Sequence, residues 1–374
     1  MTIFCGQQGS GKSTITKLIS TFSWLEKALV RQQVSVNYVM TNNRFLSTYC
    51  KYHYIDNYFK SDSYIRYEGE AFTITFEEGK VSIVPKEQGL YKMPKIMYVP
   101  AERNFMVAVE HAEKIAGLPP SLMTLQEEYR KALVAAENLP LPINGFSVRY
   151  DRLNKIAWLH GESFRVRVHE AASGLQSVIP LVSVTRNLAK QIKEGTAHPL
   201  SSEEKEKLRK EVETIYKMDL NEELRNALIQ RLNQRYRNVC FWNIVEEMEQ
   251  NLYPSSQMSV LFFLLSVFNQ AEGNELILTT HSPYILDYIT LAAKAGMMKE
   301  TLGNNKAKLL KLNSIVPLES AIAEGAYAIY QITDRGKVES LPLPSGLPED
   351  GNYLNSLLEE TNSIFNDLLE LEDE

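Results

Sequence analysis

Residues 6–13 read Gly-Gln-Gln-Gly-Ser-Gly-Lys-Ser and complete the pattern G-x-x-x-x-G-K-[ST]. In this pattern the backbone N–H groups of a glycine-rich loop surround phosphate groups, the lysine reaches the β/γ-phosphates, and the last hydroxyl group holds Mg²⁺. Residues 2–5 are apolar and predict a buried strand, and apolar residues recur at helical spacing from Ile15 to Leu29. A strand, a loop and a helix in this order aim the helix N-terminus at an anion. We therefore expect nucleotide binding through Gly6, Gly9, Ser10, Gly11, Lys12, Ser13 and Thr14, the alternative being a loop with only a structural role.

The composition sets broad limits on the class of protein. The chain has 374 residues, of which 44% are hydrophobic, so it can bury a sizeable core in two domains or in one domain with insertions. The net charge of −6 argues against general adhesion to nucleic acid, although a local basic patch is compatible with it. Cys5, Cys50 and Cys240 have no metal-binding spacing and predict free thiols in a cytoplasmic protein. There is no signal peptide, and the longest aliphatic stretch, Val260 to Val267 with its neighbours, is too short to cross a membrane.

Short apolar runs alternate with stretches at helical spacing, which predicts an α/β sheet with inserted β and helical pieces. Residues 34–100 look mostly β, and residues 174–194 look helical with a bend or a boundary expected near Pro180. A strongly apolar helix is expected at residues 256–270. Strands are expected at residues 72–76, 81–84, 95–100, 239–245, 275–280, 326–332 and 338–343.

We expect residues 1–374 to form one domain with two insertions. Residues 106–150 predict a helical lobe, and residues 199–236 are polar, charged and helical around a break near Met218, which predicts a helical hairpin arm. That arm is either a solvated surface hairpin or a partner-binding element. Residues 325–374 add strands and an acidic helix at the end.

Two carboxylates follow the strand expected at residues 239–245. Glu246 and Glu247 fall at its carboxyl end, where α/β sheets place their ligands. Glu246 suits Mg²⁺, because this ion prefers oxygen ligands, and Glu247 suits the orientation or deprotonation of an attacking water. The alternative is an acidic strand end exposed to solvent. The phosphate-binding loop earlier in the chain favours the catalytic interpretation, since hydrolysis needs both functions.

Two further segments suit phosphate chemistry. His281 ends the short apolar strand at residues 275–280, where a γ-phosphate sensor is expected, although a lone histidine is usually structural. Residues 172–176 read Ala-Ser-Gly-Leu-Gln and open a helix. Serine and glycine at a helix N-terminus form an anion site, although this segment taken alone favours an ordinary N-cap.

Together, these four segments resemble the ATP-binding-cassette ATPases in their order along the chain. Residues 172–176 are similar to the L-S-G-G-Q signature, with Ala172 in place of leucine and Leu175 in place of the second glycine. Residues 246–254 look like the E-P-E-x-x-L-H-P segment of the soluble branch. That branch includes the RecF and SMC heads and the ATPases of overcoming-lysogenization-defect (OLD) proteins.

Two more segments, residues 98–103 (Tyr-Val-Pro-Ala-Glu-Arg) and residues 173–180, resemble the OLD-like ATPases of the AAA family. The resemblance implies an ABC-type P-loop ATPase head with inserted β-hairpins and a helical hairpin, in which two heads sandwich ATP and Mg²⁺. It implies that Ser173, Gly174 and Gln176 meet the nucleotide held by Lys12 in the other head. The implied catalytic residues are Lys12, Glu247 and His281, and the implied metal ligands are Ser13 and Glu246.

The sequence departs from the family pattern at several positions. Glu246 replaces the usual aspartate, Met248 replaces proline and Tyr253 replaces histidine. No glutamine stands in a clear Q-loop position, and Gln88 is the nearest candidate. Heads of this family carry two strands before the loop, whereas five residues precede Gly6, so we expect a start further upstream or a naturally short head.

Two functions follow. The first is an ATPase that dimerises on ATP and controls a partner effector, such as a nuclease or toxin, in phage defence or DNA repair. The second is a nucleotide-gated scaffold that hydrolyses slowly or not at all. Glu247 and His281 favour the first, and Glu246 favours the second. DNA is a further candidate partner, a transporter role is a weaker option, and we expect neither a membrane partner nor a nuclease in the same chain.

Overall fold

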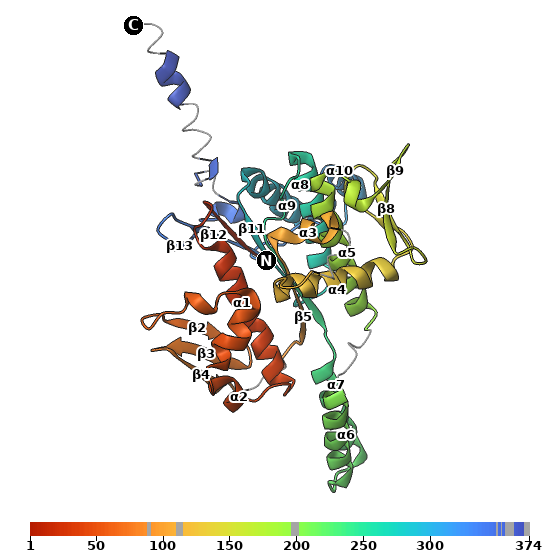
Figure 1. Cartoon of the computed structure of the whole chain (residues 1–374). Coiled ribbons are helices and arrows are strands. Elements are labelled where there is room, and N and C mark those ends of the chain that lie inside the picture. The colour runs from red at the N-terminus through yellow and green to blue at the C-terminus, as the bar shows by residue number, and fades with distance from the viewer. Residues whose placement is uncertain are drawn as a thin grey trace.

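A sheet of six strands runs through the centre of the molecule in the order β13-β12-β1-β11-β10-β5 (Figure 1). The structure is a computed structural model, and it describes residues 1–87, 91–109, 115–195, 202–348, 351–352, 354–355 and 363–369. The strands are β1 (Thr2–Gly6), β5 (Pro94–Val99), β10 (Cys240–Val245), β11 (Glu275–Thr280), β12 (Ala328–Ile332) and β13 (Val338–Ser340). Neighbouring strands from β12 to β5 are parallel, and β13 is antiparallel to β12. The predicted α/β class is confirmed, and the central sheet is largely parallel.

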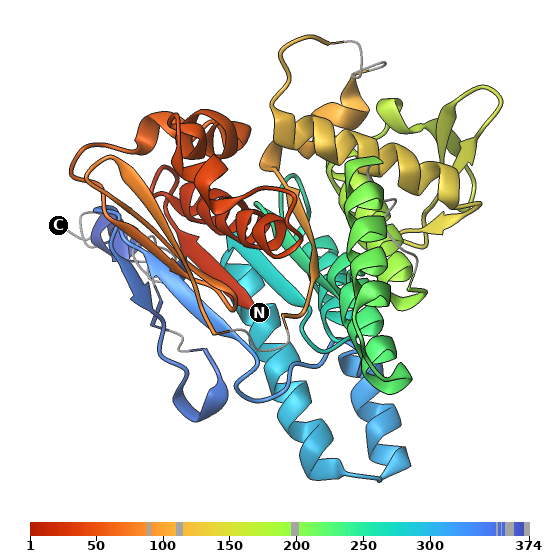
Figure 2. The same cartoon turned by 90° about the horizontal axis from the view of Figure 1, so that it is seen from below.

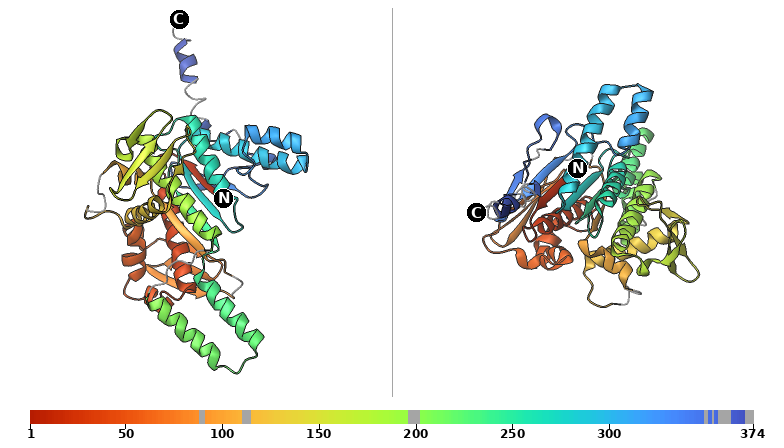
Figure 3. Two further views of the ribbon diagram at one scale, coloured as in Figure 1. Left: turned by 90° about the vertical axis from the view of Figure 1, so that its right-hand side faces the viewer. Right: turned by 90° about the horizontal axis from the view of Figure 1, so that it is seen from above.

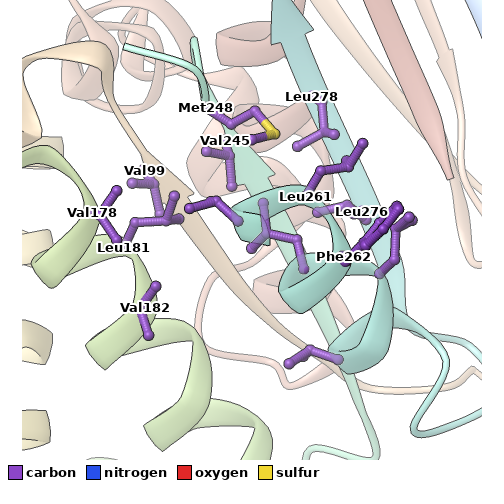
Figure 4. Close-up of a cluster of buried hydrophobic side chains, with 14 of the residues drawn as sticks. Val99, Val178, Leu181, Val182, Val245, Met248, Leu261, Phe262, Leu276 and Leu278 are labelled. Carbon is purple, nitrogen blue, oxygen red and sulfur yellow. The ribbon is translucent and has the colours of Figure 1, made fainter. Parts of the chain in front are cut away.

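Helices cover both faces of the sheet, because successive side chains of a strand point to opposite faces. On one face, Phe4 and Ile277 pack against Ile15 and Ile19 of α1 (Lys12–Val30), which Figure 2 shows lying against the sheet. On the other face, the strand residues pack against α5 (Ser173–Lys193), α8 (Pro254–Phe268) and α9 (Pro283–Leu302). Figure 4 shows part of that second core, in which side chains from β5, β10 and β11 meet those of α5 and α8. The core strands are therefore buried on both faces, as is usual for parallel sheets.

The segment between α1 and β5 differs from its prediction. It is not mostly β, because residues 36–58 form α2 (Val36–Met40) and the short helical turns η1 (Phe45–Cys50), η2 (Lys51–His53) and η3 (Asp56–Tyr58). Aromatic residues of this segment fill a separate small core, where Phe45 stacks on Phe76 and contacts Phe22 of α1. Aromatic β-propensity reflects packing on a half-buried surface, and a short helix against a sheet provides the same environment. The antiparallel sheet beside it consists of β2 (Ile65–Glu68), β3 (Phe72–Glu77) and β4 (Lys80–Pro85).

The region that precedes the signature is only partly the helical lobe predicted at residues 106–150, because strands also lie within that range. It comprises η4 (Ala101–Asn104), α3 (Phe105–Ala108), α4 (Pro120–Ala135), β6 (Leu139–Pro140), β7 (Ser147–Asp151), β8 (Ile156–His160), β9 (Arg165–Arg167) and η6 (Val168–Glu170). Strands β6 to β9 form one antiparallel sheet. Its inner side chains, including Val148 and Leu159, join the main core. Helix α5 follows η6 and continues through Pro180, where a bend or boundary was expected.

A helical hairpin extends from the body (Figures 1 and 3). It consists of α6 (Ser202–Lys217) and α7 (Glu222–Tyr236). Its root is fixed to the end of α1, because Arg31 forms a 2.8 Å ion pair with Glu204 and Gln33 donates to the same carboxylate at 2.7 Å. Arg31 is 4% exposed, so this ion pair is largely shielded from water. The root of the arm is therefore anchored at the C-terminal end of the helix that follows the glycine-rich loop.

The remaining elements lie towards the C-terminus. Helices α9 and α10 (Lys306–Ile315), which were not predicted, stand together at one side in Figure 3. A helix at residues 363–369 stands away from the body in Figure 1. The expected start of that helix near Tyr353 and the acidic residues after Leu369 lie outside the described residues, as does Gln88. Among the described helices, none is long and apolar enough to cross a membrane.

His53 links the small aromatic core to α1 and supplies a test at acidic pH. It is 3% exposed, its Nε2 lies 3.1 Å from Oγ of Ser20, and its ring meets that of Tyr98 edge-on. Burial, with a smaller effect of Lys17, lowers the pKa of His53 to about 3. The unfolded chain takes up this proton near pH 6.5 and the folded chain does not.

The stability that His53 confers is therefore complete above pH 6.5 and is lost as the pH falls towards 3. We expect the unfolding free energy of the wild type to fall over this range by up to about 1.4 kcal/mol per pH unit more than that of His53→Phe. Urea unfolding of both proteins at several pH values measures the difference. Equal pH slopes for the two proteins contradict a buried neutral His53.

Candidate nucleotide site

The loop between β1 and α1 leaves several donors without partners. Gly6 has φ +146°, and a Cβ there would meet the carbonyl oxygen of Ile332 at 2.4 Å, so only glycine fits. Helix α1 has no side-chain cap and no acidic residue in its first turn. The N–H groups of that turn therefore lack acceptors within the helix. The buried Oγ of Ser10 also has no hydrogen-bond partner among the described residues. Donors without acceptors at a helix N-terminus fit a phosphate group.

Lys12 lies over this loop. Its side chain is largely buried, and Nζ donates to the carbonyl oxygens of Gly6 at 2.8 Å and Gln7 at 2.6 Å. Burial lowers the pKa of Lys12, and the carboxylate of Glu247 is the strongest influence that opposes this. The structure therefore brings the loop lysine and the expected catalytic carboxylate close enough to interact.

Glu246 follows β10 and faces α1. It is 3% exposed, and its Oε1 accepts a hydrogen bond from Oγ1 of Thr16 at 3.3 Å. The same hydroxyl group contacts the carbonyl oxygen of Ser13 at 3.1 Å. Burial and the carboxylate of Glu246 raise the pKa of Tyr98 far above its ordinary value. The carboxylate of Glu246 thus lies beside the first turns of α1, which include Ser13. The side-chain oxygen atoms of both residues are suitable ligands for Mg²⁺.

Glu247 and His281 form a pair at the ends of adjacent strands. Oε1 of Glu247 lies 3.2 Å from Nε2 of His281, and both side chains are partly exposed. The hydrogen bond from His281 is the main cause that lowers the pKa of Glu247, so this carboxylate is ionised at neutral pH. Glu247 has φ +44°, a left-handed conformation that is costly for a residue other than glycine. Its N–H donates to Oγ1 of Thr279 at 3.0 Å, which helps to hold this turn.

Glu249 is a site residue whose role the sequence did not reveal. Its Oε1 accepts from Oγ1 of Thr280 at 2.9 Å and from the backbone N–H of His281 at 2.7 Å. Its Oε2 is buried without a partner among the described residues, and burial raises the pKa of the carboxyl group. Glu249 thus fixes the backbone at His281. The only signal was the third glutamate of residues 246–249, which the family resemblance included without a function.

Arg103 is the second such residue, and it is fully buried. Nη1 donates to the carbonyl oxygen of Glu246 and Nη2 to that of Glu247, both at 2.7 Å. Nε donates to the carbonyl oxygen of Ser177 in α5 at 3.1 Å. Burial lowers the pKa of Arg103 to about 10, so it stays charged at neutral pH. One guanidinium group therefore ties the carboxylate turn to the helix that begins at the signature.

The signature-like residues lie at the start of α5. Ser173 is exposed and is the first residue of the helix, because the N-cap is Ala172, which has no capping side chain. Gly174 faces the loop after Glu249, where a Cβ would meet the carbonyl oxygen of Asn251 at 2.5 Å. Gln176 donates to the carbonyl oxygen of His169 at 2.8 Å. Within the described part of the chain, no recorded hydrogen bond or ion pair joins these residues to residues 6–14.

No protein-family model matches the chain, and no curated relative matches it in sequence. Among solved structures, it is similar to a crystal structure of the SMC head bound to the C-terminal winged-helix domain of ScpA. The TM-score is 0.36 and the sequence identity is 9%, over 92% of each chain. A similarity this low does not show a shared family, so the resemblance to OLD-like ATPases remains a prediction.

Proposed function

We propose that this chain binds ATP with Mg²⁺ and hydrolyses it at the carboxyl ends of β1, β10 and β11. The observation that carries the proposal is the convergence of the glycine-rich loop, Lys12 and the Glu247–His281 pair at one edge of the sheet. Parallel α/β sheets bind ligands at this edge. A structural loop alone would not require an ionised carboxylate in a strained backbone conformation beside the lysine.

Each residue has a defined part in the proposed reaction. Residues 9–14 hold the phosphates through backbone N–H groups, and Lys12 adds a positive charge. Ser13 and Glu246 would hold Mg²⁺, which when bound offsets the negative charge of the phosphates. Glu247 accepts the proton of the attacking water, since it is already ionised. His281 would donate a hydrogen bond to the terminal phosphate, and Glu249 holds its backbone through the 2.7 Å hydrogen bond.

The proposal extends to a homodimer in which two chains enclose the nucleotide. The support is the exposed Ser173 at an uncapped helix N-terminus, because such a site attracts an anion. We further propose a partner effector such as a nuclease or toxin, a DNA transaction in phage defence or repair, and a cytoplasmic location.

Ser173→Arg tests the dimer. The variant adds bulk and charge at the exposed start of α5 and leaves residues 6–14 of its own chain untouched. We expect normal folding and ATP binding but no dimer induced by ATP, measured by sedimentation velocity in a Glu247→Gln background that preserves bound ATP. Ser314→Arg, on the exposed surface of α10, is a matched control that should dimerise normally. A nucleotide-dependent dimer of unchanged stability in Ser173→Arg contradicts the sandwich.

One observation favours the alternative, a nucleotide-gated scaffold with slow or no hydrolysis. Glu246 is one methylene longer than the aspartate of the family pattern, and its Oε1 is engaged by Thr16 at 3.3 Å. A carboxylate whose Oε1 remained hydrogen-bonded to Thr16 would bind Mg²⁺ less tightly. ATP binding without turnover in the wild type is the result expected of the scaffold.

A further inference from the structure

The outer face of the antiparallel sheet β7–β9 carries cations around an aromatic ring. Arg149, Trp158 and Arg167 lie opposite one another on three adjacent strands, so their side chains share one face. His160 and Arg165 form the next opposed pair on that face. The alternate residues Val148 and Leu159 belong to the main core, which leaves the first set facing outwards. In Figure 1, β8 and β9 lie at the periphery, on the side of the molecule away from β2–β4.

The side chains on this face contact one another, and the charge of Arg165 also acts on the carboxylate of Asp151. The guanidinium carbon of Arg165 lies 3.8 Å from the centre of the Trp158 ring, and that of Arg167 lies 5.9 Å from it. Burial, together with the charges of Arg149 and Arg165, lowers the pKa of His160, which places both charges near the imidazole ring. Among the described residues, no carboxylate lies within ion-pair distance of Arg149, Arg165 or Arg167.

The acidic groups nearby have other partners. Asp151 accepts from the backbone N–H groups of Leu153 and Asn154, both at 3.0 Å, in the turn after β7. Glu170 accepts from the backbone N–H of Arg167 at 3.1 Å and forms no ion pair with the guanidinium group of that residue. This concentration of positive charge contrasts with the net charge of −6 for the whole chain. Local positive charge on an acidic protein attracts a polyanion to that surface.

We propose that this face, made by Arg149, Trp158, His160, Arg165 and Arg167, binds single-stranded nucleic acid. The row of guanidinium, indole and guanidinium groups offers planar surfaces for bases and cations for the phosphates on either side. Free base faces occur in single strands and not within a duplex, so the aromatic ring favours single strands. An acidic peptide would satisfy the cations, but it offers no planar base to stack on the indole and guanidinium groups.

The face is close in sequence to the proposed dimer site. Arg167 ends β9, and the chain then passes through η6 to Ser173 at the start of α5. The backbone N–H of Ala171 donates to the carbonyl oxygen of Val168 at 3.2 Å, which makes this connection compact. A strand bound on the sheet would thus lie beside the signature. Binding itself requires no ATP, so it is independent of the proposed hydrolysis.

The test is fluorescence anisotropy with a labelled 15-nucleotide oligodeoxythymidine, without ATP, at several salt concentrations. Arg149→Ala/Arg167→Ala should bind roughly ten- to a hundredfold more weakly at low salt. The slope of log K against log salt should fall by about 1.4, because each phosphate contact in a single strand contributes about 0.7. Trp158→Leu should lose at least about fivefold in affinity, the lower end for base stacking. The charge-matched control is Lys60→Ala/Lys80→Ala, which removes two exposed cations near and on the β2–β4 sheet and should bind like the wild type.

Three results overturn the proposal. The first is that the wild type does not bind the oligonucleotide at low salt. The second is that the arginine double variant binds with unchanged affinity and salt slope. The third is that polyglutamate of equal charge competes as well as the oligonucleotide while Trp158→Leu binds normally. The last result would assign the face to an acidic protein. Circular dichroism melting of each variant checks that it folds. Lys12→Ala should bind the oligonucleotide normally, which separates failure here from failure of the proposed ATPase.

Discussion

Lys12→Ala is expected to abolish most measurable binding of ATP, with a loss of roughly a hundredfold or more. Nζ of Lys12 lies on the carbonyl oxygens of the loop, at 2.8 Å from that of Gly6 and 2.6 Å from that of Gln7. Charge-assisted hydrogen bonds contribute about 1.5–3 kcal/mol each, and a lysine over the β/γ-phosphates makes more than one. Isothermal titration calorimetry with ATP and Mg²⁺ measures the loss.

The matched control for this variant is Lys17→Ala, which removes the same group from the same helix. Lys17 lies more than one turn beyond the loop and its charge acts near His53. It should keep the affinity of the wild type within about threefold, because surface charges at this distance contribute little. Equal ATP affinity in Lys12→Ala and the wild type contradicts the assignment of residues 6–13.

Glu247→Gln is expected to bind ATP normally and to turn it over at least about 10² times more slowly. Glutamine keeps the shape and the hydrogen bond to His281 but cannot accept the proton, and loss of a general base costs roughly 10²- to 10⁴-fold. We expect normal ATP affinity because Glu247 is partly exposed and lies outside the glycine-rich loop. Steady-state release of phosphate, with binding measured separately, gives both values.

Glu246→Gln is the informative comparison, since it changes the neighbouring carboxylate in the same way. The carboxylate of Glu246 is buried beside Thr16 and faces α1. We therefore expect Glu246→Gln to affect activation of the attacking water less than Glu247→Gln does, and to require a higher concentration of Mg²⁺ for turnover. If Glu247→Gln retains turnover while Glu246→Gln abolishes it, the assignment of roles is wrong by one residue.

The sequence predicted those parts of the site that depend on short, contiguous patterns. The loop at residues 6–13 carries its own glycines and lysine, and the apolar runs before Glu246 and His281 placed both residues at strand ends. Because parallel strands share one carboxyl edge, these patterns were enough to predict that the residues meet. The α/β class followed from the same alternation of strands and helices.

The unpredicted parts depend on contacts between segments far apart in the chain. Arg103 acts on carbonyl oxygens 143 and 144 residues away, and no local pattern encodes that partner. Gly174 is needed because Asn251 approaches it, which is a property of the packing of α5 on a later loop. Residues 36–58 lie within the stretch 34–100 that was predicted to be mostly β, but apolar side chains of this segment pack into the small core from helical turns.

A single-turnover experiment tests the central claim most directly. Wild-type protein in excess over radiolabelled ATP and Mg²⁺ is quenched at intervals, and the bound nucleotide is separated into ATP and ADP. The arrangement of Lys12, Glu247 and His281 predicts conversion of the bound ATP to ADP in one exponential phase. ATP that stays bound and intact through the time course would contradict hydrolysis and would favour the scaffold.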